Sequence, residues 1–174
     1  MEELKYPIGK FQYQGPYSEE QKRRFIKEIA ETPAILKEAI KNFSEAQLET
    51  PYRQGGWTVR QVVNHMADSH MNAFIRFKLA LTEENPTIKP YEQDQWANLA
   101  DSLNSPIELS LNLLDTLHQK WVILLNSLSS DDFKRTYMHP ESGSSNLEKV
   151  LGMYAWHSKH HLAHVTGVRD RLRK

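Results

Sequence analysis

Residues 105–128, SPIELSLNLLDTLHQKWVILLNSL, repeat apolar side chains at alternating spacings of three and four. This period matches the 3.6 residues of an α-helical turn, so it predicts a long amphipathic helix with one face toward a core. Ser105 and Glu108 form the pattern of a capping box, with Pro106 at the first helical position. The apolar positions are Ile107, Leu111, Leu114, Leu117, Trp121, Leu124 and Leu128.

Three more segments show the same periodicity behind helix start signals. With the segment quoted above they make four predicted helices. In chain order, helix 1 follows Ser18, helix 2 spans about 59–81, helix 3 is the quoted segment, and helix 4 spans about 147–172. Pro33 lies inside the first helix and predicts a kink or break just before it, because proline removes an N–H donor and crowds the preceding turn.

The connection between the second and third helices is long. Residues 82–105, TEENPTIKPYEQDQWANLADSLNS, contain two prolines that forbid a continuous helix but leave room for a short one at 94–101. Strand signals are scarce. The pattern therefore predicts an all-α fold, a four-helix bundle with one long connection between helices 2 and 3. We expect a single domain over 1–174, with 1–17 as an extended N-terminal segment.

Composition excludes several classes of function. Basic and acidic residues number 22 each, so no net field attracts nucleic acid or anionic lipid. No apolar run approaches the ~18 residues of a membrane span, and the amino end lacks a signal-peptide pattern, so we expect a cytoplasmic protein. The chain has no cysteine. Any site chemistry must therefore use histidine, carboxylates, tyrosine, serine or a bound ion.

Residues 156–164, WHSKHHLAH, hold four of the eight histidines. Two pairs, His157 with His161 and His160 with His164, have the spacing of four that lets two imidazoles meet one ion. On a helical wheel the first pair turns toward the apolar face, whereas His160 and His164 lie on the rim or solvent side. The sequence thus favours His157 and His161 as ligands, since a metal would satisfy ring nitrogens that burial leaves without partners.

A third ligand must come from another helix, and the second helix offers His65 and His70. Their spacing of five sets them about 140° apart, so they cannot serve the same ion. His70 lies inside the apolar stripe and His65 at its edge. The stripe alone would favour His70, although a single core histidine is often a hydrogen-bonded packing residue.

The order of motifs resembles a known family over nearly the whole chain. GGWTVRQVVNHMADSHMNAFIRFKLALTE at 55–83, a leucine-rich helix and WHSKHHLAHV at 156–165 resemble the DinB-like superfamily of four-helix-bundle metalloproteins, in particular its YfiT-like metal-dependent hydrolases. The resemblance implies His65, His157 and His161 as metal ligands. It also implies zinc or nickel, open positions for water or substrate, a small-molecule substrate and a homodimer.

Competing metal motifs fit poorly. A zincin needs H-E-x-x-H, but Ser158 follows His157, and the paired Glu-x-x-His motifs of di-iron bundles do not occur. Three imidazoles with an open position suit metal-dependent hydrolysis. They also suit transfer of a low-molecular-weight thiol, such as bacillithiol, bound as thiolate. A stress-linked metal-binding protein without turnover is a third reading, and the sequence does not separate the three.

Several polar residues lie within about a turn of the predicted ligands. Asp68, His70 and Tyr154 are the candidates to orient an imidazole or move a proton, with Asn64 beside them. The same residue types also serve in ordinary helix packing. His160 and His164 are further candidates to assist the site, and His118 and His139 lie more remotely in the third helix and the loop after it.

Overall fold

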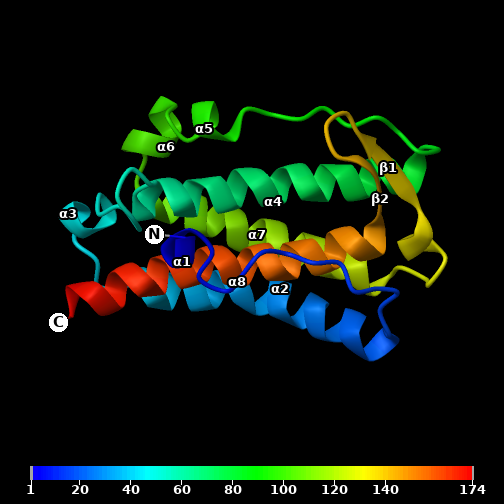
Figure 1. Cartoon of the computed structure of the whole chain (residues 1–174), viewed down its shortest axis with the longest axis horizontal. Helices are drawn as coiled ribbons and strands as arrows, with labels where there is room; N and C mark the ends of the chain where they lie inside the picture. Colours follow the sequence, from blue (N-terminus) through cyan, green and yellow to red (C-terminus); the bar gives the residue numbers. More distant parts are fainter. Residues whose placement is uncertain (1, 174) are drawn as a thin grey trace.

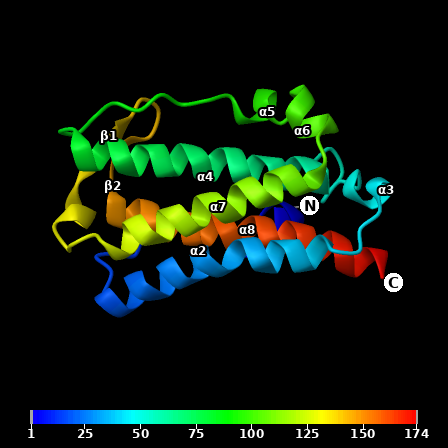
Figure 2. The same ribbon diagram turned by 180° about the vertical axis from the view of Figure 1, so that it is seen from behind.

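The computed structural model describes residues 2–173. Within them, four long helices form the bundle: α2 (Glu19–Ile40), α4 (Val59–Thr82), α7 (Ile107–Asn126) and α8 (Leu147–Leu172) (Figure 1). Helices α2 and α4 each pack against both α7 and α8. The reverse view in Figure 2 has α7 and α2 in front. The predicted all-α bundle is confirmed, with one small addition, a two-stranded hairpin.

Short elements connect the long helices. Two of them, α5 and α6, replace the single short helix predicted at 94–101, and α1 interrupts the N-terminal segment that was expected to be extended. The hairpin before α8 was not predicted; its strands pair antiparallel from Thr136↔Asn146 to His139↔Gly143. Gly143 has φ +79, a conformation that favours glycine. The short elements are α1 (Glu2–Lys5), α3 (Glu45–Leu48), α5 (Gln93–Trp96), α6 (Ala100–Asn104), η1 (Asp132–Lys134), β1 (Thr136–His139) and β2 (Gly143–Asn146).

The helix starts follow the predicted caps at two places and depart from them at a third. Ser18 and Thr58 form the predicted capping boxes of α2 and α4. The box predicted at Ser105 is wrong, because Ser105 follows the end of α6 and its hydroxyl donates instead to the Asp101 carbonyl of that helix. Pro106 is the N-cap of α7, which then starts without a side-chain cap.

Helix α2 continues through Pro33, so of the predicted kink or break the break is excluded. Packing against α7 and α8 holds the helix together across the missing hydrogen bond. Because proline has no N–H, the carbonyl of Ile29, four residues earlier, has no backbone donor from position 33. The ring of His118 on α7 takes that role, with its Nδ1 2.6 Å from the Ile29 oxygen.

Within residues 2–173 the interior contains two apolar cores with a layer of histidines between them. One core lies toward the hairpin and includes Phe77 and Trp121. The other lies toward the start of α4 and includes Val62 and Leu114. None of the helices in this part of the chain is both long and apolar enough to span a bilayer. The helices pass from one core to the other between Ile29 and Leu36 in α2, Ala67 and Ala73 in α4, Leu114 and Trp121 in α7, and Ala155 and Val165 in α8.

Candidate metal centre

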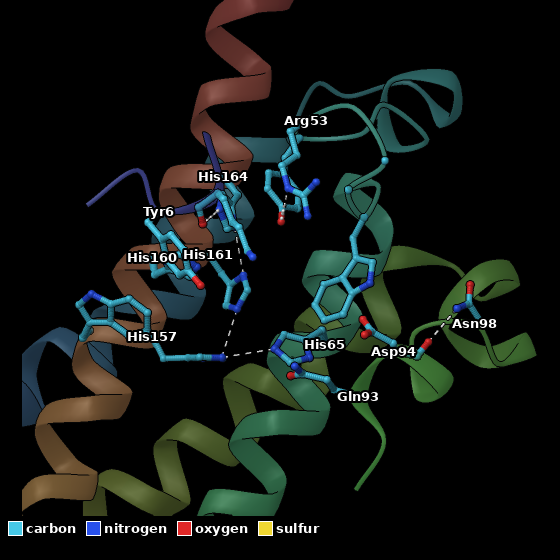
Figure 3. Close-up of a pocket in the computed structure, with 16 residues that line it drawn as sticks. Tyr6, Arg53, His65, Gln93, Asp94, Asn98, His157, His160, His161 and His164 are labelled. Atoms are coloured by element: carbon cyan, nitrogen blue, oxygen red, sulfur yellow. Dashed lines mark hydrogen bonds between the residues drawn. The ribbon is translucent and has the colours of Figure 1, made fainter. Parts of the chain in front are cut away.

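Three histidine rings converge where α4 faces α8. The Nε2 atom of His157 lies 3.3 Å from Nε2 of His65 and 3.1 Å from Nε2 of His161. The ligand atoms of the three residues all lie within 4.8 Å of one another. Figure 3 shows His65 reaching from α4 toward the two rings on α8. The structure thus brings together the residues that the family resemblance singled out.

These separations suit a single metal ion. Two imidazole nitrogens bound to one zinc at about 2.0–2.1 Å are about 3.3 Å apart at a tetrahedral angle and about 2.9 Å apart at a right angle. The observed spacings of 3.1 and 3.3 Å fall between those limits. The residues present therefore fit a divalent metal, provided that each Nε2 atom carries a lone pair.

A chain of hydrogen bonds sets that lone pair on His157. A carbonyl can only accept, so Nδ1 of His118 donates to Ile29, and Nε2 of His118 accepts from Nδ1 of His70 at 2.7 Å. Nε2 of His70 then accepts from Nδ1 of His157 at 3.0 Å. The hydrogen on Nδ1 leaves Nε2 of His157 free to bind a metal.

A second chain does the same for His161 and also ends on a backbone carbonyl. Nε2 of His164 lies 3.3 Å from the carbonyl oxygen of Lys5 and must donate to it. Nδ1 of His164 is then the acceptor for Nδ1 of His161, 3.4 Å away. This leaves Nε2 of His161 with its lone pair directed toward His157. The N-terminal helix α1 thereby helps to orient a ligand on the last helix.

The electrostatics favour neutral rings. Burial lowers the pKa of His65 to about 4, and burial followed by repulsion from neighbouring rings lowers the pKa of His157 and of His161 well below the usual range. Neutral imidazole is the form that binds a metal, so the site needs no deprotonation near neutral pH. A divalent ion would also supply the positive charge that these rings do not carry themselves.

The three rings lie at the wall of a cavity of about 780 Å³ (Figure 3). The Trp57 ring packs on His65 with centroids 4.6 Å apart. Tyr52 and Trp156 add further aromatic wall, while Arg53 and Asp94 bring charge. The cavity volume is in the range typical of small-molecule sites.

The helical wheel misplaced His160 and His164. Both are buried, at 7% and 5% exposed, rather than on the rim or in solvent. The N-terminal segment covers His160, with the Tyr6 ring centroid 6.0 Å from that of His160. The loop before α4 covers His164, with the Tyr52 ring stacked on it at 3.9 Å. A helical wheel treats one helix in isolation, so it does not predict burial by residues from other segments.

His160, His161 and His164 also form a compact histidine cluster. In this second cluster Nδ1 of His161 and Nδ1 of His164 are hydrogen-bonded to each other. The His164 ring is therefore engaged in orienting His161, whereas the three Nε2 atoms of the first cluster converge on one point. Among residues 2–173, Nδ1 of His160 is buried without a hydrogen-bond partner.

The remaining candidates fall into different surroundings. His70 is fully buried, and its ring contacts His118 and His157 rather than the cavity. The Tyr154 hydroxyl donates to the backbone carbonyl of Ser69. Asp68 is partly exposed, and burial followed by repulsion from Asp101 raises its pKa to about 6. Asn64 donates to backbone carbonyls of Arg60 and Ser102 and accepts from Ser110, so it joins helices.

A comparison with family models identifies the superfamily of the chain. The model of the DinB superfamily matches residues 28–165. The chain belongs to the DinB superfamily. The resemblance drawn from residues 55–83 and 156–165 is thereby confirmed.

Close relatives of this DinB-superfamily chain come from Bacillus. A Bacillus cereus (strain B4264) protein named "Putative metal-dependent hydrolase" is 55% identical over 172 residues, which cover 99% of each chain. A Bacillus mycoides (strain KBAB4) protein with the same description is also 55% identical over 172 residues. The solved structure of YfiT from Bacillus subtilis, described as "a probable metal-dependent hydrolase with an unusual four-helix bundle topology", matches with a TM-score of 0.96 and 49% identity over 98% of both chains.

Proposed function

We propose that this protein is a metal-dependent hydrolase whose ion is held by His65, His157 and His161. Zinc is the metal we expect, with nickel as the alternative. The observation that supports the proposal most directly is the convergence of three neutral imidazole nitrogens, 3.1 and 3.3 Å apart, at the wall of an open cavity. The names of the Bacillus relatives point to the same activity.

Each part of the site has a role in this proposal. Zinc with three imidazole ligands and an open position supplies a water nucleophile near neutral pH and polarises a carbonyl group. His70 and His164 hold two of the ligands in the tautomer that binds metal. Tyr52, Trp57 and Trp156 form an aromatic wall against which an apolar part of a substrate can pack. Asp94 borders the same cavity and can accept a proton there.

Transfer of a low-molecular-weight thiol is the alternative function. The cavity adjoins a second hollow of about 420 Å³, and the two share His157, Gln93 and Asp94 in their walls. Together they leave room for a cosubstrate beside an electrophile. The chain has no cysteine, so the sulfur would arrive with the cosubstrate.

Metal content of the untagged protein tests the ligand set. We expect about one zinc or nickel per chain in wild type, and loss of that metal in His65→Ala and in His157→Ala. His139→Ala is the matched control, because His139 lies in β1 outside the histidine layer. Retention of stoichiometric metal by both ligand variants would refute the assignment.

Turnover separates the candidate functions. Hydrolysis of a panel of carboxylic and phosphoric esters, abolished by chelation and restored by zinc, would establish the hydrolase. If no ester is hydrolysed, a sulfur-to-cobalt charge-transfer band on adding thiol to the cobalt-substituted protein would favour thiol transfer. A protein that binds metal but gives neither result would be a metal-binding protein without turnover.

A further inference from the structure

The second hollow extends the metal-side cavity along α4 and α8. Ser69, Arg76, Tyr91 and Tyr154 line it, and His157 borders both spaces. The connection from α4 to α6, which runs alongside α4 in Figure 1, contributes its wall over residues 90–94. The two spaces share three wall residues and together form a trough, which starts at the three histidines and ends toward the hairpin, where His139 and Glu141 border it.

Arg76 lies in the far end of this trough. It is eleven residues after His65 and seven after Ser69 on α4, so all three project within about 20° of one direction. The side chain is only 9% exposed. The positive charge of its guanidinium must be balanced by neighbouring groups or by a ligand.

The two other buried basic side chains have carboxylate partners. Arg60 is paired with Glu45 and Glu49, and Lys22 lies 2.6 Å from Glu19 and 4.0 Å from Glu148. Arg76 is different. Within residues 2–173, no carboxylate oxygen lies within 4.0 Å of its guanidinium nitrogens.

The groups around Arg76 are neutral or distant. Its polar neighbour is the Tyr137 hydroxyl, whose pKa burial raises to about 12. Tyr91 is equally neutral, with its pKa raised to about 12, again chiefly by burial. The acidic residues that border the hollow are exposed and lie beyond ion-pair distance: Glu92, Asp94 and Glu141.

A buried charge without a partner is strongly unfavourable, and proteins retain one chiefly where a ligand completes the pair. We propose that Arg76 binds an anionic group of the substrate, a carboxylate or a phosphate, while the reacting centre lies at the three histidines. Eleven helical residues rise about 16 Å, and the arginine side chain reaches back along part of that distance. The substrate class is therefore an elongated anionic molecule with roughly 10–15 Å between the two centres.

This inference rests on the proposed function for the position of the reacting centre, but the anion site itself can be tested without metal. The probes are inorganic phosphate and succinate, titrated into metal-free protein while the Nε–H resonance of Arg76 is followed by ¹⁵N NMR. Without metal, no probe can bind through the metal centre, so a response reports on Arg76 alone. The stronger of the two probes identifies which anionic group the site prefers.

We expect saturable shifts of the Arg76 resonance in wild type and in the control Arg23→Met, which changes an exposed arginine on α2. Arg76→Met should weaken probe binding at least tenfold, measured by calorimetry, and Arg76→Lys should weaken it less because the charge remains. Arg76→Met should also raise the unfolding midpoint of the metal-free protein, because it removes an unpaired buried charge.

Two results would overturn the proposal: probe affinity unchanged in Arg76→Met, or a lower unfolding midpoint in that variant together with no response of the Arg76 resonance in wild type. Failure of ester hydrolysis would leave the probe titration unaffected. The anion site and the hydrolase can therefore fail separately.

Discussion

His118 is 1% exposed and hydrogen-bonded through both ring nitrogens, to Ile29 on one side and His70 on the other. It does not touch the metal centre, yet it determines which nitrogen of His70 carries hydrogen and, through His70, which nitrogen of His157 does. Loss of such an outer partner typically lowers metal affinity 10–100-fold.

His118→Phe should therefore weaken zinc binding by about 10–100-fold while all three ligands remain. Phenylalanine fills a similar volume, so the bundle should still form. Competition with a chromophoric chelator measures the affinity. His139→Phe is the control and should bind zinc as wild type does; equal affinity in His118→Phe would show that the hydrogen-bond chain has no influence on the metal.

His118 also makes stability depend on pH. Burial lowers its pKa to about 4, against about 6.5 in the unfolded chain. Between these values the unfolded chain binds a proton that the folded chain excludes, so the free energy of unfolding falls as pH falls from about 6.5 to about 4. This one histidine contributes a slope of about 1.4 kcal/mol per pH unit within the window.

Urea unfolding with chelator present, at several pH values between 4 and 7, measures that slope. In His118→Phe the free energy of unfolding should fall less steeply with falling pH, by about 1.4 kcal/mol per pH unit, because one fewer proton is taken up on unfolding. Above pH 7 the pH dependence of the two proteins should coincide. Parallel stability curves across the whole range would mean that His118 is protonated equally in the folded and unfolded states.

The short N-terminal helix α1 and the residue after it contact histidines of α8, the last helix of the chain. The carbonyl of Lys5, the last residue of α1, accepts from His164, and the following Tyr6 covers His160. Nothing in the local sequence of α1 signals this contact, because its partner is 159 residues away.

Deleting residues 2–8 should leave the four long helices intact but free the His164 ring, so that His161 loses its fixed tautomer. We expect zinc affinity to fall at least tenfold, with far-UV circular dichroism nearly unchanged. Substituting Glu2 and Glu3 by glutamine is the control, since both side chains are exposed and the Lys5 carbonyl is retained. A deletion variant with wild-type affinity would contradict the second hydrogen-bond chain.

Prediction from sequence succeeded for elements whose signals are local. The capping boxes at Ser18 and Thr58 and the apolar periods located the long helices to within a few residues. It failed where a residue serves a neighbour from another segment. Pro33 does not break α2 because packing holds the helix together, and Ser105 closes α6 rather than opening α7.

The same distinction applies to the site. The helical wheel predicted that His157 and His161 face the core, and the family resemblance added His65 as the third ligand. The roles of His118, His164 and Arg76 depend on which segments fold beside them, and the spacing of residues along one helix does not contain that information. Only Arg76 had a signal in the sequence, because it is a charged residue between Phe74 and Phe77, which belong to the apolar face of the helix.

At the scale of the whole molecule, the proposed metal site lies where the two apolar cores meet. A bound ion links α4 to α8 between these cores, so it should stabilise the entire bundle. At a free zinc concentration 100 times the dissociation constant the gain is about 2.7 kcal/mol.

Thermal unfolding should therefore show a higher midpoint with zinc than with chelator in wild type. The difference should disappear in His157→Ala and persist in His139→Ala. A zinc-dependent shift of normal size in His157→Ala would place the stabilising ion elsewhere.

The bundle also exposes apolar side chains on α7, with Leu109 61% and Ile123 73% exposed. We expect a homodimer and predict that this face lies in its interface, because such a surface is unfavourable in water. Light scattering on wild type and on Leu109→Ser/Ile123→Ser tests this. The double variant should be monomeric, while Leu4→Ser, at another exposed leucine, should remain a dimer.

Three of the four long helices, α4, α7 and α8, contribute histidines to the layer between the cores, and α2 contributes the Ile29 carbonyl that accepts from His118. If one helix slipped by a single turn, about 5.4 Å, its polar residues would leave the layer and enter an apolar core. Each ring nitrogen left without a partner there would cost about 1–3 kcal/mol. The proposed metal ligands and their partners thus also discriminate against misaligned bundles, because the hydrogen bonds that orient the ligands favour one register of the helices.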